Sequence, residues 1–305
     1  MKRVACCLLA LGALPLASTA AQEVEPASAE IAPAAVPAEQ PRGVVEAELA
    51  LYRGEQPLVL GSELEGYALS SWLGARYRVL DPLELELGWG FTYAKTEVQS
   101  ALGSDDDRGF RSANPWLGAN WVGVLRVGAP MALRIGLGLA LPAAKAVDEP
   151  LEDHAEVAGL LVAPGMRGAW DLWRWLPDTL GIAVSSSLVA RPHPVLALRA
   201  SLGLGFLAPV RQEDGEDRDL EIAAQLGVDL AVLPVEHFTI GMRLQGVILT
   251  VGDDQFQSAL EPFVGVEVEQ VLLRLGLMIN LDEPYGTGFG AGDVWALRLS
   301  GSARF

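Results

Sequence analysis

The sequence predicts an all-β chain, namely an antiparallel up-and-down transmembrane β-barrel of about twelve strands. Apolar residues alternate with small or charged ones along many segments, and short connections alternate with long ones. Hydrophobic residues make up 50% of the chain although its formal net charge is −17. A soluble protein this acidic is seldom this apolar, whereas a barrel needs apolar side chains on only one face of each strand. A helical membrane protein is excluded, because no second long apolar run follows the N-terminal one.

The N-terminus has the pattern of a cleavable export signal. Basic residues at positions 2 and 3 precede an uncharged apolar run at 4–17, and small residues follow at 18–21. We therefore expect residues 1–21 to be a signal peptide. Both cysteines, Cys6 and Cys7, lie inside it, so the expected mature chain has no disulfide.

The next segment, residues 22–43, is rich in Ala, Pro and Glu and has no aromatic residue. Such a composition offers little apolar surface to bury, so we expect a disordered periplasmic spacer there. The barrel itself is expected to occupy residues 44–305.

A period of two is clearest over residues 83–93, where every odd position is large and apolar. The even positions hold Glu, Gly or Thr, and a strand separates these two sets onto opposite faces, whereas a helix would mix them. The set expected to face lipid here is Leu83, Leu85, Leu87, Trp89, Phe91 and Tyr93.

Connection lengths support a barrel that crosses an outer membrane. Tight links such as 81–82 and 269–270 alternate with longer acidic or Gly-rich links such as 97–113 and 282–293. Outer-membrane barrels have short periplasmic turns and longer outside loops.

One segment, residues 142–178, does not fit the alternation, because counting strands from the two ends gives opposite directions there. Either it contains no barrel strand, which leaves twelve, or it contains two short strands, which gives fourteen; we favour twelve. Trp170, Trp173 and Leu176 are spaced as in a helix, so we expect a short helix on the membrane surface around 166–176. The alternative places these tryptophans on strands as interfacial aromatics.

The sequence ends in an aromatic residue that apolar or small residues precede at alternate positions. These residues are Trp295, Leu297, Leu299, Gly301, Ala303 and the terminal Phe305. The pattern resembles the C-terminal signal of bacterial outer-membrane β-barrel proteins, which the barrel assembly machinery recognises. The resemblance implies a location in the bacterial outer membrane, with lipid, lipopolysaccharide and the assembly machinery as partners.

Charged residues on the other face of the strands must point into the lumen, because exposing them to lipid costs about 2–4 kcal/mol at the midplane. They could form a paired network that closes a narrow lumen, or rings that select solutes by charge. Inward glycines, such as Gly203 and Gly205, leave room for solute or let a neighbouring side chain approach. The expected lumen set is Arg76, Arg78, Glu84, Glu86, Arg126, Arg134, Arg199, Glu221, Asp229, Arg243, Glu261, Glu267, Arg274 and Arg298.

The sequence offers little for other chemistry. No motif places His154, His193 or His237 beside a nucleophile, so we expect no enzyme, and no cofactor is indicated. Nucleic-acid binding is excluded by the acidic balance. No metal site is predicted; the acidic run Asp105, Asp106 and Asp107 is only a weak candidate for divalent cations.

These observations favour a passive channel or uptake pore for a small solute. Two other functions stay open: a closed structural or surface barrel with acidic, cation-binding loops, and a membrane-embedded hydrolase. The sequence does not specify the solute or the oligomeric state.

Overall fold

The computed structural model describes most of the expected barrel. Its described residues are 42–57, 63–100, 103–127, 129–147, 153–211, 220–250, 255–282, 284–286, 289 and 293–305. The expected signal peptide and nearly all of the expected spacer lie outside these residues.

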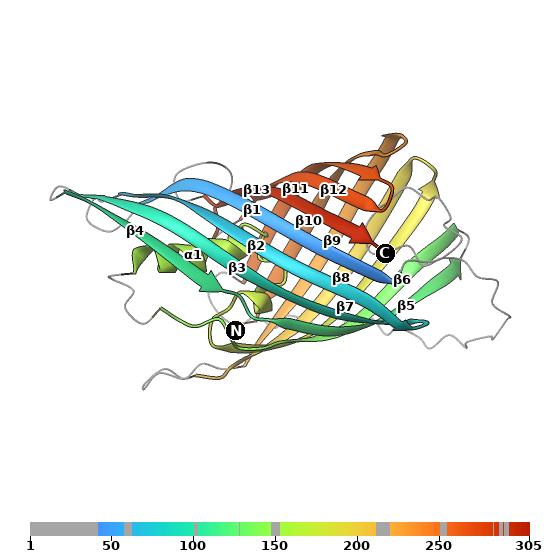
Figure 1. Cartoon of the computed structure of the whole chain (residues 1–305), viewed down its shortest axis with the longest axis horizontal. Coiled ribbons are helices and arrows are strands. Elements are labelled where there is room, and N and C mark those ends of the chain that lie inside the picture. Colours follow the sequence, from blue (N-terminus) through green and yellow to red (C-terminus); the bar gives the residue numbers. More distant parts are fainter. Residues whose placement is uncertain are drawn as a thin grey trace, which may run out of the picture.

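The described strands form one antiparallel sheet that closes on itself through the pairing of β2 with β3 (Figure 1). Strands adjacent in sequence are neighbours almost throughout, as an up-and-down barrel requires. The strands are β1 (Gly43–Pro57), β2 (Glu63–Leu80), β3 (Leu83–Ser100), β4 (Gly103–Ser112), β5 (Trp116–Val127), β6 (Ala129–Ala140), β7 (Thr179–His193), β8 (Leu196–Pro209), β9 (Glu221–Val235), β10 (Phe238–Leu249), β11 (Phe256–Val268), β12 (Val271–Asn280) and β13 (Trp295–Arg304).

The barrel has twelve strand positions, because β4 and β5 share one edge of β3. The outer half of β3 pairs with β4 from Phe91 onward, and its first residues, Leu83 to Gly88, pair with β5. The chain breaks from strand geometry only at 113–115 between the two. The prediction of twelve strands rather than fourteen is therefore confirmed.

One expected loop is wrong in its form. Residues 97–113 are predicted to be one of the longer links between strands, but the end of β3 and the whole of β4 pair there as an extended hairpin. Backbone pairing continues there although the side chains no longer alternate between apolar and polar.

The two faces of the wall differ as the alternation predicts. Leu85 and Leu87 are 47% and 59% exposed on the outer face of β3. Glu84, on the opposite face of the same strand, is only 8% exposed. Large exposed apolar side chains recur at alternate positions on nearly every strand, so the exterior is an apolar surface suited to lipid.

The two ends of the barrel also differ. Two-residue turns at 81–82, 194–195, 236–237 and 269–270 lie at one end, which we call the turn end. Gly43 and Phe305 exchange backbone hydrogen bonds of 2.9 and 3.0 Å at the same end. The opposite end, the loop end, carries the β3–β4 hairpin and the helix α1 (Figure 1).

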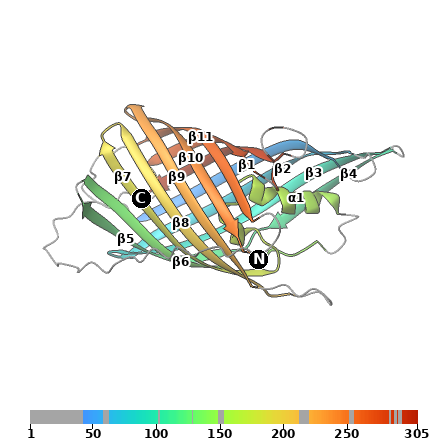
Figure 2. The ribbon, with the colours of Figure 1, turned by 180° about the vertical axis from the view of Figure 1, so that it is seen from behind.

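Residues 153–178, which we call the plug, fold back from β6 into the barrel. The plug contains α1 (His154–Gly165) and the 3₁₀ helix η2 (Leu172–Arg174), and α1 lies along β3 and β4 (Figure 2). Among the described residues, no helix is long and apolar enough to cross a membrane.

The expected surface helix at 166–176 is wrong in its environment, and only the three-residue 3₁₀ helix η2 lies within that range. The α-helix ends at Gly165, and the chain then turns through Gly168, Ala169 and Asp171, all with positive φ. Trp173 and Trp175, only 2% and 5% exposed, lie inside the barrel. The helical spacing of Trp170, Trp173 and Leu176 reflects a compact series of turns with one short 3₁₀ helix. Trp116 and Trp72 of the inner wall cover Trp173 and Trp175, so these two rings do not lie at a membrane interface.

Inward glycines make room for the plug. A Cβ atom on Gly205 would collide with the ring of Trp173, and one on Gly181 would lie 2.6 Å from the Cβ of Trp173. At these positions glycine lets a side chain approach the wall closely, which is one of the two roles that the sequence left open.

If the outer face of the barrel contacts lipid, the loss of stability caused by a charged substitution there should depend on its depth in the membrane. Leu202, at the middle of β8 and 58% exposed, changed to Arg should lower the free energy of unfolding by about 2–4 kcal/mol. Leu80, 67% exposed beside a turn, is the matched control, and Leu80→Arg should cost about 0–1 kcal/mol. Urea-dependent folding into vesicles measures both. Equal costs at the two depths would contradict the assignment of this surface to lipid.

Candidate functional site in the lumen

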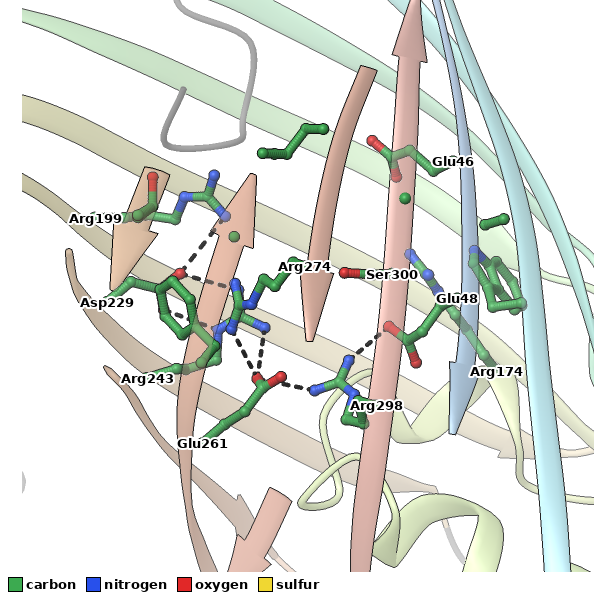
Figure 3. Close-up of a pocket in the computed structure, with 17 residues that line it drawn as sticks. Glu46, Glu48, Arg174, Arg199, Asp229, Arg243, Glu261, Arg274, Arg298 and Ser300 are labelled. Carbon is green, nitrogen blue, oxygen red and sulfur yellow. Dashed lines mark hydrogen bonds and ion pairs between the residues drawn. The ribbon is translucent and has the colours of Figure 1, made fainter. Parts of the chain in front are cut away.

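A continuous chain of ion pairs runs along the inner wall from β9 to β1. Asp229 accepts two hydrogen bonds from Arg243, at 2.8 and 2.9 Å. Arg243 also lies 3.4 Å from Glu261, and Arg298 bridges Glu261 at 3.1 Å and Glu48 at 2.6 Å. Each of these contacts joins two different strands, and the pair of Arg298 with Glu261 spans the intervening β12, so the chain links this part of the wall side by side (Figure 3).

Two more arginines join this chain. Arg199 of β8 lies 3.8 Å from Asp229, and Arg274 of β12 lies 3.0 Å from Glu261. The guanidinium of Arg274 also stacks over the ring of Phe263, with its carbon 3.6 Å from the ring centroid. Glu261, which is 2% exposed, is thus surrounded by three arginines.

The chain of ion pairs continues into the plug through Arg167. Arg167 pairs with Glu48 at 2.9 Å and donates to the hydroxyl of Ser70 at 2.8 Å. Its guanidinium covers the ring of Trp175 at 4.2 Å. The side chain of Gln245 donates to the backbone carbonyls of Arg167 and Gly168, so wall side chains hold both the charge and the backbone of the plug.

Arg174 is the second cation of the plug. It lies 3.5 Å from Glu86 of the wall and 3.2 Å from Asp171 of the plug. Its guanidinium also lies over the wall rings of Trp72 and Trp116, at 4.4 and 5.0 Å. Charge and aromatic contact therefore act together at this point.

The start of α1 is anchored to β4. A carboxylate oxygen of Asp107 accepts the backbone N–H of Ala155 at 2.9 Å, and Arg111 pairs with Glu156 at 2.7 Å. A helix N-terminus has unsatisfied N–H groups, and here a neighbouring strand supplies the acceptor.

Asn114, fully buried at the break between β4 and β5, ties the end of the plug to the wall. Its amide nitrogen donates to the carbonyls of Trp173 and Leu176 at 3.0 and 2.8 Å. Its oxygen accepts the N–H groups of Ala143 and Ala144 at 2.9 and 2.8 Å.

On the opposite wall, Asn280 donates to the carbonyl of Gly165 at 2.9 Å. Tyr285 packs beside the same turn of the plug, and burial raises the pKa of Tyr285 to about 12, so its hydroxyl remains protonated near neutral pH.

A cavity of about 190 Å³ remains between the plug and the turn end. Thr239 and Leu272 line it, and each is the second residue of a strand that begins at a turn. Arg174 of the plug and Trp72 line it as well. The charged residues at the cavity are Glu46, Glu48, Arg174, Arg199, Asp229, Arg243, Glu261, Arg274 and Arg298.

The structure brings most of the expected lumen residues into ion pairs. Glu84 pairs with Arg134 at 2.6 Å and with Arg78 at 3.5 Å, and Arg76 pairs with Glu46. Glu221 lies apart, at the loop end of β9, and the side chain of Arg126 lies outside the described residues. The expected residues gathered in the chain of ion pairs are Arg199, Asp229, Arg243, Glu261, Arg274 and Arg298; Glu86 pairs with Arg174 of the plug, and Glu267 with Arg304 at 3.3 Å.

Sequence reasoning missed several members of this network. Glu46 and Glu48 alternate with Val45, Ala47 and Leu49, so the same period-two argument would have found them. Arg167 and Arg174 carried no such signal, because they lie in the segment whose path the alternation could not trace.

The other singled-out residues lie outside the lumen network. Asp106 is 3.7 Å from Lys95, and the side chain of Asp105 lies outside the described residues. Within the described part of the chain, no three His, Cys, Asp or Glu side chains are grouped to hold a metal. His154 begins α1 at the loop end, whereas His193 and His237 lie at the turn end.

The C-terminal residues form the seam of the barrel. β13 pairs with β1 and β12, and Leu297, Leu299 and Phe305 are 43%, 49% and 64% exposed on the outside. Trp295, Gly301 and Ala303 complete the alternation along this strand. Recognition of this strand by the assembly machinery stays a prediction.

No protein-family model and no curated protein matches the chain. Among solved structures, an outer-membrane channel from Pseudomonas putida F1 is similar, with a TM-score of 0.57 at 14% identity, covering 93% of this chain and 100% of that one. The transport unit of the autotransporter AIDA-I from Escherichia coli gives 0.47 at 10% identity, over 89% and 93% of the two chains. At such identities the likeness to the channel concerns the fold alone.

A closed barrel with an apolar exterior and a charged interior is the architecture of outer-membrane proteins, and the similar channel has the same fold. The chain is therefore a bacterial outer-membrane β-barrel. By the rule of short inner turns, its turn end faces the periplasm and its loop end faces outward.

Because Glu261 pairs with three arginines, we expect it to contribute strongly to the free energy of unfolding. Glu261→Gln leaves three arginines without their shared carboxylate, and breaking such a buried pair should lower the free energy of unfolding by about 3–5 kcal/mol. Glu65→Gln, which breaks the exposed pair with Arg53, is the matched control and should cost about 0–1 kcal/mol. Denaturant unfolding in micelles measures both, and similar losses would show that the buried pairs add no special stability.

Proposed function

We propose that the protein is an outer-membrane channel for a small solute, and that the plug closes it in the structure described here. The observation that carries this proposal is the charged cavity within the lumen, directly on the periplasmic side of the plug. A barrel that served only as a scaffold could fill this space with wall side chains, as narrow barrels do.

The contacts between plug and wall suit a gate. Arg167, Gln245 and Asn280 hold the plug through ion pairs and hydrogen bonds. Water can replace such contacts when the plug shifts, because every polar group that is released would face a wet lumen. The interface also has an apolar part, where Trp173 packs on Trp116 and Trp175 on Trp72, and exposing that surface to water opposes the shift.

The plug can move without breaking the wall. The chain leaves and re-enters the wall at one place, since the N–H of Asp178 donates to the carbonyl of Ala144 at 2.8 Å, and the N–H of Ala146 donates to the carboxylate of Asp178 at 2.9 Å. β6 and β7 pair directly below this point, from Ala140 and Gly181 onward. The plug is thus an insertion in a hairpin that is complete without it.

A closed structural barrel is the second candidate, and the burial of the plug favours it. Met166 and Trp173 are at most 2% exposed, and Trp173 stacks on Trp116 with centroids 6.4 Å apart. Under this alternative the ion pairs serve stability alone.

Neither candidate function assigns a catalytic role to the histidines, because His154 is separated from His193 and His237 by the length of the barrel.

We further propose that the exterior contacts lipid and lipopolysaccharide, and that the assembly machinery reads β13. The alternating outward residues of this strand support the latter assignment.

The first prediction concerns removal of the plug. Replacing residues 147–176 with a short Gly-Ser linker should turn a largely closed barrel into a steadily conducting one, since the linker joins ends that already touch. Single-channel recording in planar bilayers measures this change. Wall folding is checked by heat-modifiable migration in gels. A folded, plug-free barrel that never conducts would support the closed structural barrel instead.

The second prediction keeps the plug and locks it. A Cβ atom on Gly159 would lie 3.5 Å from that of Ala94, a separation that suits a disulfide. The pair Gly159→Cys and Ala94→Cys should therefore fasten α1 to β3, abolish openings of the full-length channel when oxidised, and restore them on reduction. The two single-cysteine variants are controls and should open like the wild type. Openings that persist in the oxidised double variant would show that conduction does not require movement of α1.

A further inference from the structure

The inner wall formed by β8 to β13 carries more positive than negative charge at the cavity. Four arginines, on β8, β10, β12 and β13, face two carboxylates of the same wall, Asp229 and Glu261. A third carboxylate, Glu48, is divided between Arg298 and Arg167. The four arginines are Arg199, Arg243, Arg274 and Arg298.

The remaining charges at the cavity do not offset this surplus. Glu46 is paired with Arg76, and Arg174 is paired with Glu86 and Asp171. Uncompensated charge in a largely buried site is costly, so a bound anion would stabilise this wall.

Arg274 is the residue best placed to receive an anion. It lines the cavity and reaches Glu261 through one nitrogen, Nη2, at 3.0 Å. Glu261 is shared with Arg243 and Arg298, so Arg274 has no carboxylate of its own among the ion pairs of the described residues. Arg274 is one of the residues that line the cavity, and in the view of Figure 3 it lies between Arg199 and Ser300.

The cavity is only partly polar. Phe263, Leu272 and Trp72, each at most 8% exposed, also line it. Its volume of about 190 Å³ leaves room for a small molecule. A ligand with a single charge and a compact apolar body matches both the surplus charge and this lining.

We propose that the cavity is a binding site for small organic monocarboxylates, with Arg274 as the residue that receives the carboxylate. Guanidinium groups bind carboxylates through paired, charge-assisted hydrogen bonds. The apolar body of the ligand then lies against Phe263 and Leu272. This assignment rests on the proposed channel, because it names the class of solute that the lumen would accept on the periplasmic side of the plug.

Equilibrium binding tests the site without requiring permeation. The full chain, purified in detergent, is titrated with benzoate in a calorimeter, and benzyl alcohol serves as the uncharged analogue. Benzoate should bind with one site per chain, and benzyl alcohol should bind at least ten times more weakly. No benzoate binding, or equal binding of the two compounds, overturns the proposal. Competition by chloride as strong as that by benzoate would also overturn it, because the site would then be one for simple anions.

Two variants place the binding in the cavity. Arg274→Gln should weaken benzoate binding at least tenfold, whereas Arg53→Gln, a matched change at an exposed pair on the loop end, should leave it unaltered. Ser300→Leu keeps every charge, fills part of the cavity, and should also weaken binding at least tenfold. It decides the question if Arg274→Gln does not fold. Unchanged affinity in a folded cavity variant overturns the assignment.

The outcomes separate this inference from the proposed function. A barrel that binds benzoate yet never conducts, with or without the plug, retains the site and loses the channel. A barrel that conducts without the plug yet binds no benzoate retains the channel and loses the site.

Discussion

The structure depends on one constraint: a charge at membrane depth must face the lumen and must find a partner there. Exposure to lipid and isolation in the interior are both costly, so the inward charges of neighbouring strands are forced into contact. The result is the chain from Asp229 through Glu261 and Arg298 to Glu48, which joins strands that are far apart in the sequence. Because Arg167 extends this chain, the same constraint also fixes the position of the plug.

The sequence predicted the wall well, because the physics of the wall is local. Alternation along 83–93 assigns each residue to lipid or lumen with no knowledge of neighbouring strands, and Leu87 and Glu84 lie as expected. The strand count followed from the same local pattern, together with the requirement that an even number of strands brings both termini to the same end of the barrel. The local pattern also identified most of the charged residues that form ion pairs. It did not identify their partners, since residues such as Glu48 and Arg298 are separated by most of the chain.

The path of the plug could not be predicted, because its apolar and polar residues follow no regular spacing along the sequence. Trp173 and Trp175 are buried by Trp116 and Trp72, and these contacts exist only once the barrel has closed. Asn114 shows the same limit. Its sequence context marks a break before proline, whereas its side chain binds the carbonyls of Trp173 and Leu176 and the N–H groups of residues 143 and 144. A polar residue that serves a distant backbone leaves no pattern in its own neighbourhood. The cavity, likewise, is the space left over by these long-range contacts.

The shared edge of β3 has a consequence for the surface of the molecule. Since β4 ends the order of the sheet, its outer edge has no strand partner among the described residues. Exposed edges of this kind invite another chain to add a strand, and natural proteins discourage such pairing with charged residues. The run of aspartates at 105–107, followed by Arg108, lies on this strand. We therefore expect the charge of this strand to disfavour the addition of a strand from a second barrel at this edge.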